Sequence, residues 1–291
     1  MLKRYFSRSF NFKASDTELP EFYRRIFDDP ANKLYKELYI TRLGFDDKIE
    51  ANREFALKSQ DVIKRNEPIM RVSTNFCIDE TSFYSNVIKS RSKHIKKLDE
   101  INQKLLDSKT ISPATKSKLN SLLKMAFEMY SDYLVKGPES AASALLENGM
   151  IVGLQDFGDR QLQNMFSIRD IEKVLAIRSA MEIINEKVCE AFDKIDSEVF
   201  LRCLYAVRLH TLPLTNTNGV LNPNLPALLF PLKNLVDRCF SPNCFLHTYF
   251  DYPTDSEYLI LKAERDIQPD ESLSITCGHK CKINSQYRSF D

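Results

Sequence analysis

The sequence predicts an α+β protein: a mostly helical N-terminal region followed by a small β-rich module. In residues 170–193 and 197–210, apolar residues recur at helical spacing along one face. After residue 227 the apolar runs become short, rich in β-branched and aromatic residues, and separated by turn residues. The change from a helical to a strand pattern therefore falls in the last third of the chain.

The composition is that of a globular protein. Of the 291 residues, 43% are hydrophobic and 28% are charged, which are ordinary values for a folded domain. No apolar run approaches the roughly 18 residues that a transmembrane helix needs, so no transmembrane segment is expected. The seven cysteines are odd in number and widely spaced, which indicates thiols rather than a disulfide framework.

Residues 1–15 form a basic segment that contains serine and aromatic residues and no acid. Its four basic residues are Lys3, Arg4, Arg8 and Lys13. Such a segment is typical of a mitochondrial presequence, and a disordered basic tail is the alternative. The rest of the chain contains 37 basic and 40 acidic residues. It therefore has no net positive charge that would attract nucleic acid. We therefore expect a mitochondrial matrix protein.

Residues 16–65 are predicted to form helices, broken near Asp29-Pro30 and Gly44. The segment Asp16–Pro20 has polar cap candidates and an early proline, as at a helix start. Apolar residues then recur at helical spacing at Leu34, Leu38, Ile40 and Leu43. The Glu67-Pro68 step is expected to end the helical segment.

Residues 81–106 are predicted to form an amphipathic helix with a lysine-rich face. Its apolar positions include Leu98, Ile101 and Leu105. The basic positions are Lys89, Arg91, Lys93, Lys96 and Lys97. A solvated helix face explains them, and contact with RNA or a ribosome is the alternative.

Further helices are expected at residues 112–135, 139–147, 170–193 and 197–210, followed by a loop at 212–226. The helix expected at 197–210 carries Phe200, Leu204 and Val207 on one face. Strands are expected at 228–230, 245–250, 258–263 and 273–276.

Residues 227–278 carry a family resemblance. Two segments match the pattern of a known family in order and spacing. They are Pro242-Asn243-Cys244 and Arg265-Asp266-Ile267-Gln268-Pro269-Asp270-Glu271-Ser272-Leu273-Ser274-Ile275-Thr276-Cys277-Gly278. They resemble the C-terminal half of a SET domain, the fold of S-adenosylmethionine-dependent protein-lysine methyltransferases. The helix at 197–210 and the run Ala227–Leu232 resemble the Rubisco-methyltransferase and MYND types of that family.

The resemblance implies a domain organisation. Together with the composition of residues 1–15 and the helical periodicity, it predicts a presequence at 1–15, a helical region at 16–165, a SET-like domain with a helical insertion at 166–280 and a C-terminal tail at 281–291. The N-terminal half of the SET fold is not recognisable in the sequence. It is expected either in rewritten form within residues 65–165 or replaced by helices.

The residues at the family's chemical positions differ from the family pattern. The resemblance implies an Asn-His pair and a Gly-x-Gly segment that hold the cofactor, and a terminal Tyr that orients the lysine amine. Asp237-Arg238 stands at the pair, Cys277 stands at the Tyr, and no Gly-x-Gly occurs. Asp accepts but does not donate, Arg is a fixed cation, and a thiol is a weak donor. Tyr287 is an alternative source of the phenol.

Zinc binding is an alternative interpretation of the cysteines and histidines in residues 239–281. The resemblance to SET proteins with a post-SET segment implies zinc held by cysteines on either side of the terminal motif. The candidate ligands here are Cys239, Cys244, His247, Cys277, His279 and Cys281. Their spacing is too loose for a known zinc motif, so no metal site is predicted. We expect Cys244 to be a packed residue and Asn243 to satisfy backbone groups where strands cross.

These observations predict a mitochondrial SET-like protein without catalytic activity or cofactor. It would act by binding a protein partner in mitochondrial gene expression or respiratory-complex assembly. The alternative is an active S-adenosylmethionine-dependent protein-lysine N-methyltransferase on a mitochondrial protein substrate. A third reading is ribosome contact through Lys89, Lys93, Lys96 and Lys97.

Overall fold

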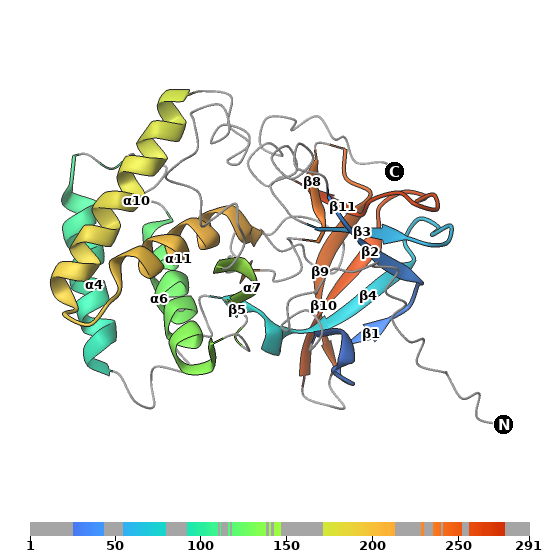
Figure 1. The fold of residues 1–291 in the computed structure, drawn as a ribbon, viewed down its shortest axis with the longest axis horizontal. Helices are drawn as coiled ribbons and strands as arrows, with labels where there is room; N and C mark the ends of the chain where they lie inside the picture. Colours follow the sequence, from blue (N-terminus) through green and yellow to red (C-terminus); the bar gives the residue numbers. More distant parts are fainter. Residues whose placement is uncertain are drawn as a thin grey trace. The chain divides into compact units, whose positions relative to one another are not determined.

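The chain divides into two compact units (Figure 1). The computed structural model describes residues 26–43, 55–79, 92–109, 111, 116, 118–137, 140, 143–146, 171–212, 228–229, 235–239, 241–251 and 256–276. We call the first unit the β unit; it comprises Met1–Phe76, Pro213–Pro223 and Leu232–Asp291. The second is the helical unit, Cys77–Leu212 with Asn224–Pro231.

The β unit contains eight of the described strands and one turn of 3₁₀ helix, η1 (Thr74–Phe76). The strands are β1 (Lys33–Leu34), β2 (Leu38–Arg42), β3 (Phe55–Ser59), β4 (Pro68–Ser73), β8 (Asp237–Cys239), β9 (Cys244–Asp251), β10 (Ser256–Ala263) and β11 (Ser274–Thr276). Four of them form an antiparallel sheet in the order β1-β4-β10-β9. Strands from the two ends of the chain therefore share one sheet.

The remaining four strands lie in two pairs that backbone hydrogen bonds connect. Strands β2 and β3 pair antiparallel, and β8 and β11 pair parallel. Leu57 of β3 donates its N–H to the carbonyl of Leu235 at 2.6 Å and accepts from the N–H of Leu273 at 2.8 Å. This one residue thus holds β3 beside the segments that lead into β8 and β11.

Two turns in the β unit have the same hydrogen-bond pattern. We call residues 59–68 the first turn and residues 263–272 the second turn. Ile63 and Ile267 each donate an N–H to the other's carbonyl, at 3.0 and 2.8 Å. Asn66 then donates to the carbonyl of Ala263, and Asp270 to that of Ser59, both at 2.8 Å. The two turns are therefore related by a local two-fold symmetry.

The equivalence extends to the backbone angles and to a glutamate in each turn. Asn66 has φ 67° and Asp270 has φ 65°, in the left-handed region that Asn and Asp tolerate better than most residues. The Glu67 carboxylate accepts the N–H three residues before it at 2.7 Å. The Glu271 carboxylate accepts that of Gln268 at 2.9 Å. The elements β2-β3-turn-β4 and β9-β10-turn-β11 are thus two versions of one motif.

The face of the β1-β4-β10-β9 sheet that carries Leu259 and Leu261 is buried. Leu259 pairs with Val72, and Leu261 with Met70, and all four side chains are at most 2% exposed. Burial of such side chains contributes about 1.5–3 kcal/mol each. The register places apolar residues from positions about 190 apart against each other, so the N-terminal strands cannot complete this core alone.

The helical unit contains five described helices and a small sheet. The helices are α4 (Ser92–Asp107), α6 (Leu119–Lys136), α7 (Ser143–Leu146), α10 (Ile171–Ala191) and α11 (Ser197–His210). Strands β5 (Ile78–Asp79), β7 (Leu228–Leu229) and β6 (Thr211–Leu212) pair antiparallel in that order.

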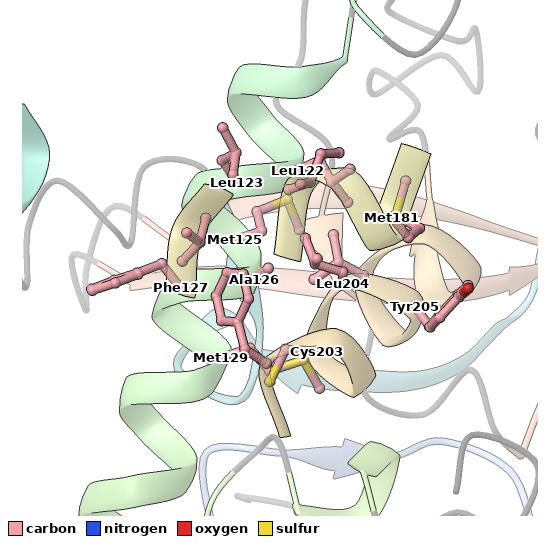
Figure 2. Close-up of a cluster of buried hydrophobic side chains, with 14 of the residues drawn as sticks. Leu122, Leu123, Met125, Ala126, Phe127, Met129, Met181, Cys203, Leu204 and Tyr205 are labelled. Atoms are coloured by element: carbon pink, nitrogen blue, oxygen red, sulfur yellow. The ribbon is translucent and has the colours of Figure 1, made fainter. Parts of the chain in front are cut away.

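Helix α6 forms the centre of the helical unit because its first three turns are buried on nearly every side. Its buried apolar residues are Leu119, Leu122, Leu123, Met125, Ala126, Phe127, Met129 and Tyr130. Figure 2 shows part of this cluster, with Ala126 of α6 near Leu204 of α11; Met181 of α10 belongs to the same cluster. A helix that is apolar on most sides is stable only when other elements cover it.

Local signals fix several helix ends. Asp196 caps α11, its carboxylate accepting the N–H groups of Glu198 and Val199 at 3.0 and 3.1 Å. Gly137 ends α6 with φ 56°, a conformation that glycine adopts without strain. At the end of α10, the Lys97 ammonium donates to the carbonyl of Ala191 at 2.9 Å, which suits the negative end of the helix dipole.

The predicted α+β class is confirmed, and so are most of the helices. The helices predicted at 170–193 and 197–210 are α10 and α11, and α4 and α6 form within the ranges predicted for them, apart from one residue at the end of each. The short helix at 139–147 is α7. No described helix is long and apolar enough to cross a membrane. The parts of these predictions at 81–91 and 112–115 lie outside the described residues.

The helices predicted for residues 16–65 are wrong wherever the structure describes residues 33–59. Leu34 lies in β1, Leu38 and Ile40 lie in β2, and Phe55 begins β3. Leu38 and Ile40 are both 2% exposed and two residues apart, so they face one side of a strand. The spacing 34, 38, 40, 43 fits a helix and a strand about equally well, and tertiary pairing decides between them.

The predicted domain organisation changes accordingly. Residues 33–73, assigned to a helical region at 16–165, supply strands of the β unit. The prediction that residues 65–165 hold the missing strands, or that helices replace them, is therefore wrong for β1, β2 and β3. In the C-terminal part, the predicted strands form as β7, β9, β10 and β11, and β8 is an additional strand. The predicted boundaries at 15, 165 and 280 lie outside the described residues.

Candidate functional site

The candidate site lies where β8 runs beside β11. In this parallel pair, Asp237 is in register with Ser274 and Arg238 with Ile275. Cys277 follows β11 directly in the sequence and lies outside the described residues. The structure thus brings the backbone of Asp237 and Arg238 beside the strand that leads to Cys277, although about 40 residues separate them in the chain.

The β2–β3 hairpin also borders this site. Leu57 of β3 bonds to Leu235 and Leu273, the residues just before β8 and β11. The connection between β2 and β3, residues 44–54, lies outside the described residues and contains one glycine, Gly44. Three separate segments of the chain therefore meet through the backbone of one buried leucine.

Asn243 fixes β11 in position through a buried network. Its side-chain oxygen accepts the N–H of Ser274 at 2.7 Å, and its amide donates to the carbonyl of Ser272 at 2.9 Å. The amide also donates to the Glu271 carboxylate at 2.9 Å. Asn243 is 1% exposed, so these bonds satisfy its own buried amide and the buried N–H of Ser274. The predicted structural role of Asn243 is confirmed.

Glu271 extends this network to the surface. Its carboxylate also accepts from the Arg265 guanidinium at 2.6 Å and from the N–H of Gln268 at 2.9 Å. Burial alone would raise the pKa of Glu271, but the hydrogen bonds from Arg265, Gln268 and Asn243 together lower it below its ordinary value of 4.5. The carboxylate is therefore charged at neutral pH.

The buried thiols of Cys203 and Cys244 are not poised for nucleophilic chemistry. Cys77, Cys189, Cys203 and Cys244 are free thiols, as predicted. Burial raises the pKa values of Cys203 and Cys244, which keeps both thiols protonated and unreactive. Cys244 is 1% exposed, a packed residue as expected. Cys277, His279 and Cys281 lie outside the described residues, and within those residues no three His, Cys, Asp or Glu side chains gather as metal ligands.

His247 of β9 is buried and neutral. Its ring stacks on that of Phe245 with centroids 6.0 Å apart. Burial lowers the pKa of His247, and the nearby Lys262 ammonium lowers it further. A neutral imidazole in such a place is most simply a packed residue.

One lysine of the predicted basic face has a structural role. Lys96 and Lys97 are exposed on α4, but the Lys97 ammonium donates to the carbonyl of Ala191 and lies over the Phe192 ring, 5.2 Å from its centroid. The side chains of Lys89 and Lys93 lie outside the described residues. Lys97 therefore serves first to hold α4 against the end of α10.

Sequence reasoning missed the N-terminal half of the β unit, although a signal for it existed. Ile63 and Glu67 are four residues apart, as are Ile267 and Glu271. In each segment an apolar residue follows the glutamate after one further position. Comparing the recognised C-terminal segment with the rest of the chain would have revealed this repeat.

Neither a protein-family model nor a curated protein sequence matches this chain. Among solved structures, it is similar to the SET domain of LSMT bound to lysine and AdoHcy, with 10% identity, a TM-score of 0.54 and 88% of this chain covered. It is also similar to Rubisco LSMT bound to AdoMet, with 11% identity, a TM-score of 0.50 and 88% coverage. The matches cover 52% and 51% of those chains, so this chain spans about half their length. At such identity the likeness shows the fold alone, and the predicted SET-like fold is confirmed.

Proposed function

We propose that this chain is a SET-fold protein that binds a partner protein and does not transfer methyl groups. The observation that carries the proposal is the pairing of β8 with β11. It sets Asp237 and Arg238 beside the strand that leads to Cys277, which is the arrangement expected if these three residues occupy the family's chemical positions. All three differ from the residues that the family uses there.

S-adenosylmethionine fits these positions poorly. Asp237 cannot donate the hydrogen bond that an asparagine amide supplies. Arg238 adds a permanent positive charge to a site for a cationic sulfonium, which is unfavourable in a low dielectric. Cys277 lacks the phenol that would orient a lysine amine for in-line attack. Residues 44–54, between β2 and β3 in the sequence, contain one glycine and no Gly-x-Gly. We therefore do not propose methyl transfer from this cofactor.

The framework around the site argues for a folded binding module. Asn243, Glu271 and Arg265 form a satisfied network that holds β11. A buried polar network of this kind favours one specific fold when every member is paired. The unit therefore keeps a defined surface for a partner while its chemical positions have changed.

The proposed location is the mitochondrial matrix, and the proposed role lies in mitochondrial gene expression or respiratory-complex assembly. The support for the location is the basic, acid-free composition of residues 1–15. A reporter carrying residues 1–15 should enter mitochondria. The same reporter with Arg4, Arg8 and Lys13 changed to Glu should stay outside. Import of both reporters, or of neither, would contradict this part of the proposal.

Calorimetry tests the absence of methyl transfer. The purified full-length chain should show no heat of binding with S-adenosylmethionine or S-adenosylhomocysteine and no transfer of labelled methyl to mitochondrial proteins. The matched control is Asp237→Asn combined with Arg238→His and Cys277→Tyr, which restores the family residues. Binding by the unchanged chain would overturn the proposal and favour an active protein-lysine methyltransferase.

Affinity purification from mitochondria tests the binding role. The unchanged chain and the three-residue control should recover the same partner, because the proposed interaction does not use methyl transfer. Recovery by the control alone would show that partner binding depends on the restored site, and it would contradict the proposal. Recovery of ribosomes that survives high salt would instead favour the ribosome reading, since simple phosphate contacts weaken steeply with salt.

A further inference from the structure

We draw no further inference here: the strongest candidate, the row of aromatic side chains formed by Phe245, His247 and Tyr249 on β9 beside Lys262, is a sheet face whose partly exposed member Tyr249 suggests a contact surface, but nothing in the described part of the chain shows what covers it.

Discussion

The first turn and the second turn share one backbone geometry but are anchored differently. In both, an isoleucine bridge, a residue at positive φ and a glutamate produce the same hydrogen-bond pattern. In the first turn, Glu67 pairs with Lys36 at 2.7 Å near the surface. In the second turn, Glu271 also bonds to the buried Asn243. Backbone pattern therefore sets the shape of each turn, and burial of the anchoring side chain decides how much that shape contributes to stability.

Shortening Ile63 or Ile267, the two residues of the isoleucine bridge, should lower the free energy of unfolding more than any other change considered, and by the same amount in both turns. Ile63 and Ile267 are each 0% exposed. Ile63→Ala and Ile267→Ala should each lower the free energy of unfolding by about 3 kcal/mol, through lost burial and a cavity. Urea unfolding of the full-length chain measures both. A loss below about 1 kcal/mol at one position, with the full loss at the other, would show that the turns are not equivalent.

The double variant sharpens this test. Because the two residues face each other across an antiparallel bridge, the second substitution should cost less once the first has been made. A coupling of about 0.5–2 kcal/mol is expected for contacting residues. Strict additivity would indicate that the two side chains do not share one packing site.

The next largest loss of stability should differ between the two turns: it is expected at Asn243, which anchors the second turn, and not at Glu37, its counterpart beside the first turn. Asn243 and Glu37 occupy equivalent positions, because the N–H of Glu264 bonds to the carbonyl of Asn243 at 2.8 Å and that of Gln60 to Glu37 at 3.0 Å. Asn243→Ala removes the partner of the buried Ser274 N–H and of the Ser272 carbonyl and should cost about 2–3 kcal/mol. Glu37→Ala should cost less than about 1 kcal/mol, because Glu37 is not fully buried. Equal costs in urea unfolding would contradict the difference in anchoring.

Replacing Glu271 should also cost more stability than replacing Glu67, but the difference should be smaller than that between Asn243 and Glu37. Glu271→Gln weakens charged hydrogen bonds to Arg265 and Gln268 and should cost about 1–2 kcal/mol. Glu67→Gln should cost less than about 0.5 kcal/mol, since water screens its pairing with Lys36. Both variants keep the side-chain volume, so the comparison isolates the charge.

The pH dependence gives an independent check on Glu271. The pKa of Glu271 is lowered in the folded protein from its ordinary value of 4.5. Its stabilising contribution is therefore fully present above about pH 4.5 and disappears as the pH falls through the folded pKa. The stability difference between the unchanged chain and Glu271→Gln should be constant from pH 7 to 5.5 and narrow below pH 4.5. A difference that grows on acidification would mean that the carboxylate is not stabilised in its charged form.

The smallest effect is expected at the positive-φ residues. Asn66→Gly should change stability by less than about 0.5 kcal/mol, because glycine adopts this conformation freely but loses more chain entropy. Asp270→Gly should cost about 0.5–1 kcal/mol more, because Asp270 also accepts a hydrogen bond from the Tyr39 hydroxyl. In a Tyr39→Phe background the two glycine variants should become equal. A difference that persists there would assign the cost to another contact.

Ultraviolet titration reports on the same contact. Burial and then the hydrogen bond to Asp270 raise the pKa of Tyr39 to about 12. In the Asp270→Gly variant one tyrosine should ionise at lower pH than in the unchanged chain. An unchanged titration curve would show that Asp270 does not influence this phenol.

Part of the candidate site could be predicted from the sequence because its motifs are local. Pro242-Asn243-Cys244 and the segment around Glu271 carry recognisable patterns, and they predicted both the SET-like fold and the structural role of Asn243. The sequence also placed Asp237 and Arg238 by their distance from this motif. Their juxtaposition with β11 depends on a parallel pair joined across about 40 residues, and no local pattern encodes such a pairing.

The sequence by itself determined the helices of the helical unit. The apolar periodicity of α10 and α11 predicted both helices and their buried faces, and the Asp196 and Gly137 ends are local capping signals. Helix formation depends on residues three and four apart, so a local pattern contains most of the information.

Only the tertiary structure determined that residues 33–73 form strands instead of the helices that their local pattern allows. Leu34, Leu38 and Ile40 fit a helix in isolation, yet β1 pairs with β4 and β2 with β3, and β4 in turn pairs with β10 about 190 residues away. A strand gains its hydrogen bonds and its buried face from a partner strand, and this partner is encoded elsewhere in the chain. The same dependence makes the Ile63–Ile267 bridge necessary, because it joins two copies of one motif that neither end of the chain can complete alone.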